Sequence, residues 1–164
     1  MKTDARPPVL DAEHAAFIQG GVTISVSSRD AAMRSSISRG VGCRVSADRS
    51  RVTLFLGGLG AQKLLRDVAA TRTIAVCFSQ PTTHRTIQIK GSDAALATVE
   101  SGDHAIIGRQ LDSRLGELVP LGYAEALVRA VFHAEPGDVV AVTFTPEAAF
   151  AQTPGPNAGR RLAV

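Results

Sequence analysis

Residues 73–91 constrain the fold most strongly, because large apolar side chains alternate there with small or polar ones on both sides of a polar loop. Ile74, Val76 and Phe78 form the apolar set before the loop, and Ile87 and Ile89 form the set after it. Alternation with a period of two around a proline-containing loop is typical of a β-hairpin. The loop and the second strand carry more polar side chains than a plain turn needs: Gln80, Thr82, Thr83, His84, Arg85, Thr86 and Gln88. They indicate either an ordinary solvated rim or a ligand-binding edge.

The same alternation recurs elsewhere, so the chain is predicted to be rich in antiparallel strands. Together with 74–79 and 85–90, six strands are expected, the others being residues 22–28, 36–46, 52–56 and 139–145. Apolar residues three and four positions apart predict helices near residues 11–19, 61–69, 107–118 and 124–132. In the third of these, Ile107, Leu111, Leu115 and Leu118 are expected to form one apolar face to bury.

Composition limits the class of protein. The 164 residues are 45% hydrophobic but only 4% aromatic, which suits a single folded domain with an aliphatic core. A net charge of +3 with scattered arginines gives no nucleic-acid footprint. No apolar run reaches the roughly 18 residues that a membrane span requires. Because the polar N-terminus also lacks an apolar signal core, we expect a cytoplasmic protein with no membrane partner.

The sequence offers no metal site and no visible catalytic motif. Cys43 and Cys77 lie in separate strand-like runs and are expected to be free, buried thiols. His84, His104 and His133 lack the spacing of metal ligands. A Gly-x-Ser-x-Gly nucleophile motif is also missing, which argues against a serine hydrolase.

Two glycine-rich stretches point to a ligand instead. Gly40 and Gly42 share one face of the second predicted strand, which either lets the strand curve or admits a flat group or another chain close to the backbone. Residues 57–60 read Gly-Gly-Leu-Gly and open a helix, whose first amides favour anions. Lys63, near the start of that helix, is either a solvated lysine or a phosphate ligand.

The order of these segments resembles the FMN-binding split barrels of the pyridoxamine 5′-phosphate oxidase-like group. Arg39 and Arg44 match a pair of basic residues separated by four others, and Leu59, Gly60 and Lys63 match a Leu-Gly-Ser-Arg-Lys-like run. The chain departs from that run at Ala61 and Gln62, and it has Arg85-Thr86 where the group often has Arg-Gln. The resemblance covers about residues 15–96.

The resemblance implies a six-stranded antiparallel split β-barrel with peripheral helices, formed by residues 1–164 as one domain. Its core would span about residues 12–146, and residues 147–164 would form a C-terminal arm or a frayed end. The resemblance also implies FMN as the cofactor, held by three segments of the chain: Arg39, Gly40, Val41, Gly42, Arg44, Leu56, Gly57, Lys63, Gln80, Thr83, Arg85 and Thr86.

The function that the resemblance implies is an FMN-dependent oxidoreductase acting on a small-molecule substrate or reductant. The group usually forms homodimers with cofactor sites at the interface, so we expect a two-fold dimer. The alternatives are a non-enzymatic flavin- or haem-binding protein on the same barrel, or a deazaflavin-dependent reductase. Two local predictions follow: Arg39, Arg44 and Lys63 converge on one phosphate, and Arg85 has a carboxylate, carbonyl or flavin partner.

Overall fold

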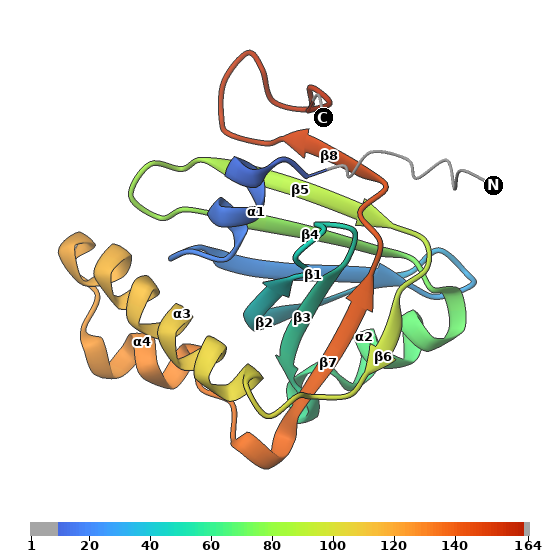
Figure 1. Ribbon diagram of the computed structural model, residues 1–164, viewed down its shortest axis with the longest axis horizontal. Coiled ribbons are helices and arrows are strands. Elements are labelled where there is room, and N and C mark those ends of the chain that lie inside the picture. Colours follow the sequence, from blue (N-terminus) through green and yellow to red (C-terminus); the bar gives the residue numbers. More distant parts are fainter. Residues whose placement is uncertain (1–9, 163–164) are drawn as a thin grey trace.

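The computed structural model describes residues 10–162, which form a strongly curled antiparallel sheet flanked by four α-helices (Figure 1). The strand order is β6-β7-β3-β2-β1-β4-β5-β8. The strands are β1 (Thr23–Arg29), β2 (Ser35–Val45), β3 (Val52–Gly57), β4 (Ile74–Ser79), β5 (Thr86–Gly91), β6 (Ala95–Ala97), β7 (Val139–Phe144) and β8 (Ala148–Ala151). The helices are α1 (Ala12–Ile18), α2 (Gly58–Thr71), α3 (Asp103–Leu118) and α4 (Glu125–Phe132), with short 3₁₀ turns η1 (Val119–Leu121) and η2 (Pro136–Asp138).

The prediction of a mainly antiparallel β fold with peripheral helices is confirmed, but a closed six-stranded barrel is wrong. All six predicted strands and all four predicted helices are present. The sheet has two further strands, β6 and β8, which form its edges and do not pair with each other in the described part of the chain. Both are short and rich in alanine, so their residues show no clear alternation of apolar and polar side chains.

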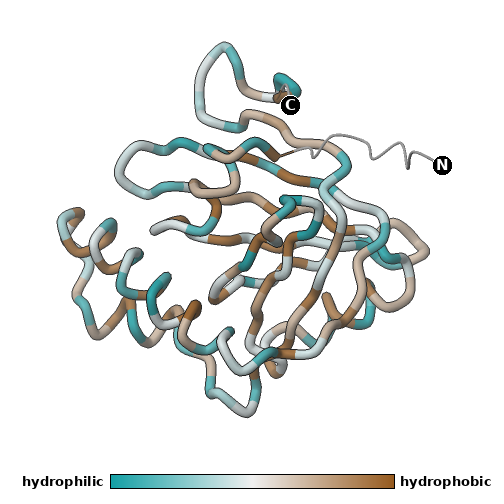
Figure 2. The backbone as a smooth tube through the Cα atoms, viewed as in Figure 1, coloured by the Kyte–Doolittle hydropathy of each residue, from teal (hydrophilic) through white to brown (hydrophobic). Residues whose placement is uncertain are grey.

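The concave face of the sheet encloses the main core. Alternate residues of the strands point inward, so that Val26, Val76, Phe78 and Ile89 are fully buried. Helices α1 and α2 pack against this face through Ile18, Leu64 and Val68, as period-two strands and an amphipathic helix require. Figure 2 shows hydrophobic residues along the central strands and alternating polar and apolar residues along α3.

A cluster of polar side chains, which we call the Asp93 clasp, joins the two ends of the curled sheet. It consists of Asp93, Thr145 and Arg51. Asp93, which follows β5, accepts hydrogen bonds from the Thr145 amide and hydroxyl at 2.7 Å each, and Thr145 follows β7. The Arg51 guanidinium reaches both residues at 3.0 Å. Gly91 lies so close to the Phe144 ring that an added Cβ would sit 2.7 Å from it. The ends of β5 and β7, which lie near opposite edges of the sheet, are thereby brought together although these two strands do not pair with each other.

Strand β2 carries a bulge that changes which of its residues share a face. Its register with β3 shifts between Gly40 and Gly42, so Val41 is an extra residue. Arg39 and Arg44 therefore face the same side of the sheet, although a regular strand would place them on opposite sides. The two glycines make room for side chains: a Cβ at Gly40 would collide with Ile24, and one at Gly42 would collide with Gln110. The space beside Gly40 and Gly42 is thus filled by side chains of the described part of the chain itself.

Helix α3 buries a polar face, which the leucine stripe did not predict. Its buried residues are Asp103, Gln110 and Arg114, whereas Leu111, Leu115 and Leu118 are only partly covered. Gln110 accepts from the Cys43 amide at 2.8 Å and donates to the Cys43 carbonyl at 2.7 Å. Arg114 donates to the carbonyls of Val22 and Val41 at 2.8 and 2.9 Å. These side chains satisfy backbone groups of Val41 and Cys43, where β2 has run past its pairing with β1, and the carbonyl of Val22 just before β1.

The segment expected to be an arm folds back on its own chain. Residues 148–151 form β8 beside β5, and Phe150 then bridges to Arg161. The Leu162 amide donates to the Ala149 carbonyl at 2.9 Å, and the Leu162 side chain packs against the main core. The sheet therefore extends past the expected core boundary at residue 146. The expectations for the first nine residues lie outside the described part of the chain.

Two further expectations concern the cysteines and membrane segments. Cys43 and Cys77 are both free, as predicted; Cys43 is buried, whereas Cys77 is partly exposed. The Cys43 thiol donates to the Ile18 carbonyl, and burial raises its pKa to about 12. Within residues 10–162, every helix is too short or too polar to cross a bilayer.

Candidate functional site

A pocket of about 490 Å³ lies where β2 and the β3–α2 junction meet the segment after α4. We call it the η2 pocket. It gathers Arg39, Val41 and Gly57 of the predicted cofactor residues. The rest of its lining comes from one neighbour on β2, the start of α2, the end of α4 and η2: Ser38, Gly60, Val131, His133, Ala134, Glu135 and Asp138. Its size falls within the range of small-molecule and cofactor sites.

Arg39 is held over the pocket by an aromatic ring. Its guanidinium lies 5.3 Å from the centre of the Phe132 ring, and the Arg114 guanidinium lies 5.1 Å from the same ring. Phe132 is buried at the end of α4. Among the described residues, Arg39 has no carboxylate within ion-pair distance. Its charge is therefore available to a ligand in the pocket.

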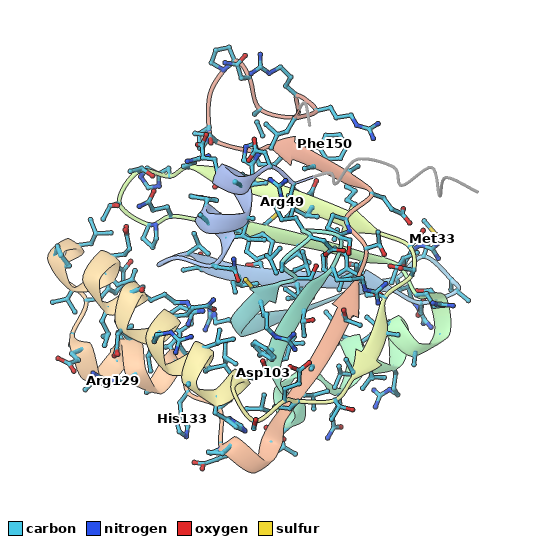
Figure 3. All side chains as sticks on the ribbon, viewed as in Figure 1. Met33, Arg49, Asp103, Arg129, His133 and Phe150 are labelled. Carbon is cyan, nitrogen blue, oxygen red and sulfur yellow. The ribbon has the colours of Figure 1, made fainter. Side chains whose placement is uncertain are left out.

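Two carboxylates also line the η2 pocket. Glu135 contacts the His133 imidazole at 2.8 Å (His133 is labelled in Figure 3). Asp138 lies at the N-terminus of α2, where its two oxygens accept from the Leu59 amide at 3.0 and 3.2 Å. The expected free amides at this helix start are thus partly used by the chain itself. The pocket combines one unpaired cation with two acids.

The three basic residues expected to converge on one phosphate are distributed over separate contacts. Arg44 lines a different pocket and binds Asp103 at 3.0 Å and Glu100 at 2.9 Å. Figure 3 labels Asp103 at the start of α3, where its side chain is almost fully buried. Lys63 binds Asp67 one helical turn later at 2.7 Å. Arg39 lines the η2 pocket, so the structure does not place these three cations around one pocket.

The polar loop between β4 and β5 is hydrogen-bonded to α3. Gln80 donates to Glu117 of α3 at 2.8 Å, and the Thr82 hydroxyl donates to the same carboxylate. These donors, the Thr82 hydroxyl first, hold the pKa of Glu117 below its usual value. Thr83 donates to Gln80 at 2.9 Å. The dense polar side chains therefore join the β4–β5 loop to α3, an arrangement that their sequence spacing could not reveal.

Arg85 has the partner that its position on an apolar face predicted. Its guanidinium lies 4.4 Å from the Phe17 ring centre and 2.8 Å from the Glu13 carboxylate, both on α1. The next residue, Thr86, bonds to the Ser79 hydroxyl and the His84 carbonyl. Leu56 is fully buried in the main core. Arg85, Thr86 and Leu56 do not line the η2 pocket.

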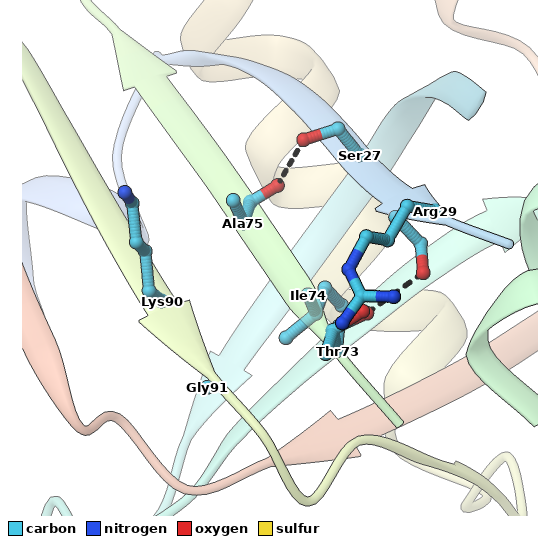
Figure 4. Close-up of a pocket in the computed structure, with 8 residues that line it drawn as sticks. Ser27, Arg29, Thr73, Ile74, Ala75, Lys90 and Gly91 are labelled. Atoms are coloured by element: carbon cyan, nitrogen blue, oxygen red, sulfur yellow. Dashed lines mark hydrogen bonds between the residues drawn. The ribbon is translucent and has the colours of Figure 1, made fainter. Parts of the chain in front are cut away.

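The outward side chains of β1, β4 and β5 form a shallow surface that no helix covers, and we call it the open face. Pairing aligns Ser27, Ala75 and Lys90 across the three strands. The same pairing aligns Ser25, Cys77 and Gln88 in the next row. At one end of this face lies a pocket of about 390 Å³, in which Lys90 and Arg29 stand on either side of β4 (Figure 4).

The side chains of the open face are mostly small, and the charged ones are basic. The Ser27 hydroxyl already donates to the Ala75 carbonyl at 3.0 Å. Acidic residues are missing from the outward positions of these three strands. The sequence analysis missed this surface, although the small outward residues that alternate with apolar ones were a visible signal.

Comparisons with known proteins show the fold but not a sequence family. No family model matches the chain, and no curated protein matches it in sequence. HupZ of Group A Streptococcus is 15% identical, with 92% of this chain and 99% of that chain covered and a TM-score of 0.55. A putative pyridoxamine 5′-phosphate oxidase of Lactobacillus delbrueckii is 12% identical, with 92% and 100% covered and a TM-score of 0.53.

An F420 reductase is also similar in structure, at 11% identity with 85% of this chain and 98% of that chain covered and a TM-score of 0.51. These solved structures span nearly the whole chain in one alignment, as expected for a common architecture. The chain therefore has the fold of these proteins, and its resemblance to the pyridoxamine 5′-phosphate oxidase-like group is confirmed at the level of the fold.

Proposed function

We propose that this protein is a flavin-dependent oxidoreductase whose flavin ring binds in the η2 pocket. The observation that carries the proposal is the pocket itself, which joins Arg39, Val41 and Gly57 as the sequence resemblance implied. Structural likeness to a putative pyridoxamine 5′-phosphate oxidase and to an F420 reductase supports a redox cofactor. A bound flavin would supply the electron transfer, while the chain would bind and orient it.

The lining of the pocket fits the ring of a flavin better than its phosphate. Val41, Val131 and Ala134 give an apolar surface, and Gly57 leaves the backbone accessible. Arg39, whose charge has no acidic partner among the described residues, can donate to a ring carbonyl. Asp138, already bound at the start of α2, repels a phosphate there. The chain's own residues thus hold and orient a planar group here, without a ready-made phosphate cradle.

The first prediction concerns the bound cofactor. The purified protein is expected to show the two near-visible absorption bands of a flavin, and Arg39→Ala is expected to lower flavin affinity by about tenfold because it removes one charge-assisted contact. Fluorescence titration with FMN measures the affinity. Arg66→Ala, an exposed change on the far part of α2, is the control and should bind as the unchanged protein does.

Other absorption spectra would indicate a different cofactor or none. One intense violet band would indicate haem, and mass spectrometry of the released cofactor would separate a flavin from a deazaflavin. A colourless protein that takes up no added flavin would contradict the proposal. Equal affinities of the protein and its Arg39→Ala variant would place the ring elsewhere.

The cofactor site is completed by a second copy in a two-fold dimer. Exposed apolar side chains form a ridge along η1 and α4: Val119, Leu121, Tyr123, Leu127 and Val131. Val131 belongs both to this ridge and to the lining of the η2 pocket, so a partner on the ridge also reaches the pocket. In the proposed dimer, the ridge of each copy packs on the small side chains of the partner's open face.

The second prediction tests this assembly by light scattering at low micromolar concentration. We expect twice the chain mass of 17.1 kDa, with an interface on the order of 2,000 Å² in total. Leu127→Arg should give a monomer that loses flavin, because a charge in the ridge cannot be buried without a partner. Met33→Arg, an exposed change in the β1–β2 loop, should stay dimeric. A monomer with stoichiometric flavin would overturn the dimer and the shared site together.

A further inference from the structure

The N-terminus of α2 already holds an anion, and that anion belongs to the chain. Gly57 caps the helix without a side-chain bond of its own. Asp138, from η2, supplies the missing acceptor by binding the Leu59 amide with both carboxylate oxygens, at 3.0 and 3.2 Å. Gly58 is needed for this approach, because an added Cβ would lie 2.9 Å from Val140 and 3.0 Å from Asp138. The carboxylate thus occupies the place that a bound phosphate would take.

We infer that Asp138 is a specificity-determining residue that excludes phosphate from α2, so that the site does not select FMN over riboflavin. This inference rests on the proposed function for its ligand, but the contact between Asp138 and α2 is independent of it. A phosphate ester carries roughly 1.5 to 2 negative charges at neutral pH. Placed at the Leu59 amide, it would meet the like charge of Asp138, and Arg39 is the only arginine or lysine among the described residues that line the pocket.

The other cations implied by the resemblance do not relieve this repulsion. The Lys63 ammonium binds Asp67, and this hydrogen bond holds the pKa of that carboxyl below its usual value. Arg44 is neutralised by Asp103 and Glu100 in a different pocket. Each cation therefore has an internal partner that a phosphate would have to displace. The resemblance to FMN-binding proteins predicts a phosphate cradle at this point, and the contacts of this chain disagree with it.

A purely structural role for Asp138 makes a different prediction. If Asp138 only capped the helix, removing its charge would lower stability without changing which ligands bind. Asp138→Asn separates the two roles, because the amide oxygen can still accept from Leu59 while the negative charge is lost. Glu135→Gln is the matched control, since it removes a charge from the same pocket without touching α2.

The experiment has a flavin-free arm and a flavin arm, both on the full chain. In the first arm, inorganic phosphate is titrated while the backbone amides of Leu59 and Gly60 are followed by NMR. These amides should not shift in the unchanged protein or in Glu135→Gln, and they should shift saturably in Asp138→Asn. In the second arm, the affinity ratio of FMN to riboflavin should be within about threefold in the unchanged protein and rise at least about tenfold in Asp138→Asn.

The outcomes separate this inference from the proposed function. Phosphate shifts at Leu59 in the unchanged protein, or a preference for FMN of tenfold or more, would overturn the inference. An Asp138→Asn variant that stays folded and still ignores phosphate would also overturn it. If neither flavin binds any variant, the proposed function fails, and the phosphate titration still decides the role of Asp138.

Discussion

Replacing Arg114 with alanine is expected to lower the free energy of unfolding by about 3–5 kcal/mol, because two carbonyls would lose their donor and a large side chain would leave a cavity. Arg114 is fully buried and donates to Val22 on the approach to β1 and to Val41 at the β2 bulge. The guanidinium of Arg114 also contacts the Phe132 ring, and the guanidinium of Arg39, which lines the η2 pocket, contacts the same ring. The substitution should therefore also weaken ligand binding.

Urea unfolding measures this loss, and Arg109→Ala is the control. Arg109 lies on the same helix but is exposed and makes no ion pair among the described residues, so its replacement should change stability by less than about 0.5 kcal/mol. Arg114→Lys should fall between the two, because a single ammonium cannot span both carbonyls as a guanidinium does. Equal stability of the Arg114→Ala and Arg109→Ala variants would show that α3 is not anchored through Arg114.

Burial explains why the expected effect of Arg114→Ala is large, although Arg114 has no carboxylate partner among the described residues. Desolvation lowers the pKa of its guanidinium to about 10, so keeping the charge inside costs stability at neutral pH. One guanidinium nitrogen also has no hydrogen-bond partner among the described residues. The two carbonyl bonds and the Phe132 contact offset this cost, and removing the side chain gives up all of them at once.

The strands were predictable because their alternation is local. Val26, Val76 and Ile89 lie at alternate positions between small or polar neighbours, and each is fully buried in the structure. Edge strands β6 and β8 escaped prediction because they consist largely of alanine, whose small side chain marks neither face. The β2 bulge also involves non-local contacts, since Ile24 and Gln110 lie against the two glycines that flank it.

The candidate site was predictable only in part. Arg39, Val41 and Gly57 come from neighbouring strands, so their meeting in one pocket follows from the predicted sheet. Arg44 and Lys63 were assigned by spacing, but their carboxylate partners decide where their charges are used. Asp138 lies 79 positions from Leu59, and nothing in a local pattern links them. Predicting that contact requires the tertiary structure, because η2 and the start of α2 are far apart in the sequence and meet only in the folded chain.

The Asp93 clasp also joins distant segments of the chain, and it is expected to be sensitive to pH because its acceptor is a carboxylate. Burial raises the pKa of the Asp93 carboxyl, but the amide and hydroxyl of Thr145 and the charge of Arg51 outweigh burial and hold that pKa below its usual value. A carboxyl whose pKa is lowered by folding stabilises the protein above its unfolded pKa, about 3.9 for aspartate, and loses that contribution as the pH falls through the folded value.

Asp93→Asn is therefore expected to lower the free energy of unfolding by about 2 kcal/mol at pH 6, near the lower limit for bonds to a charged acceptor because Asp93 is partly exposed. The difference from the unchanged protein should shrink as the pH falls below about 4, since both then carry a neutral group. Urea unfolding across this pH range measures it, with the exposed Asp112→Asn as the control on α3. A difference that stays constant down to about pH 2 would show that packing at Gly91 and Phe144, and not the charge of Asp93, closes the two ends of the sheet.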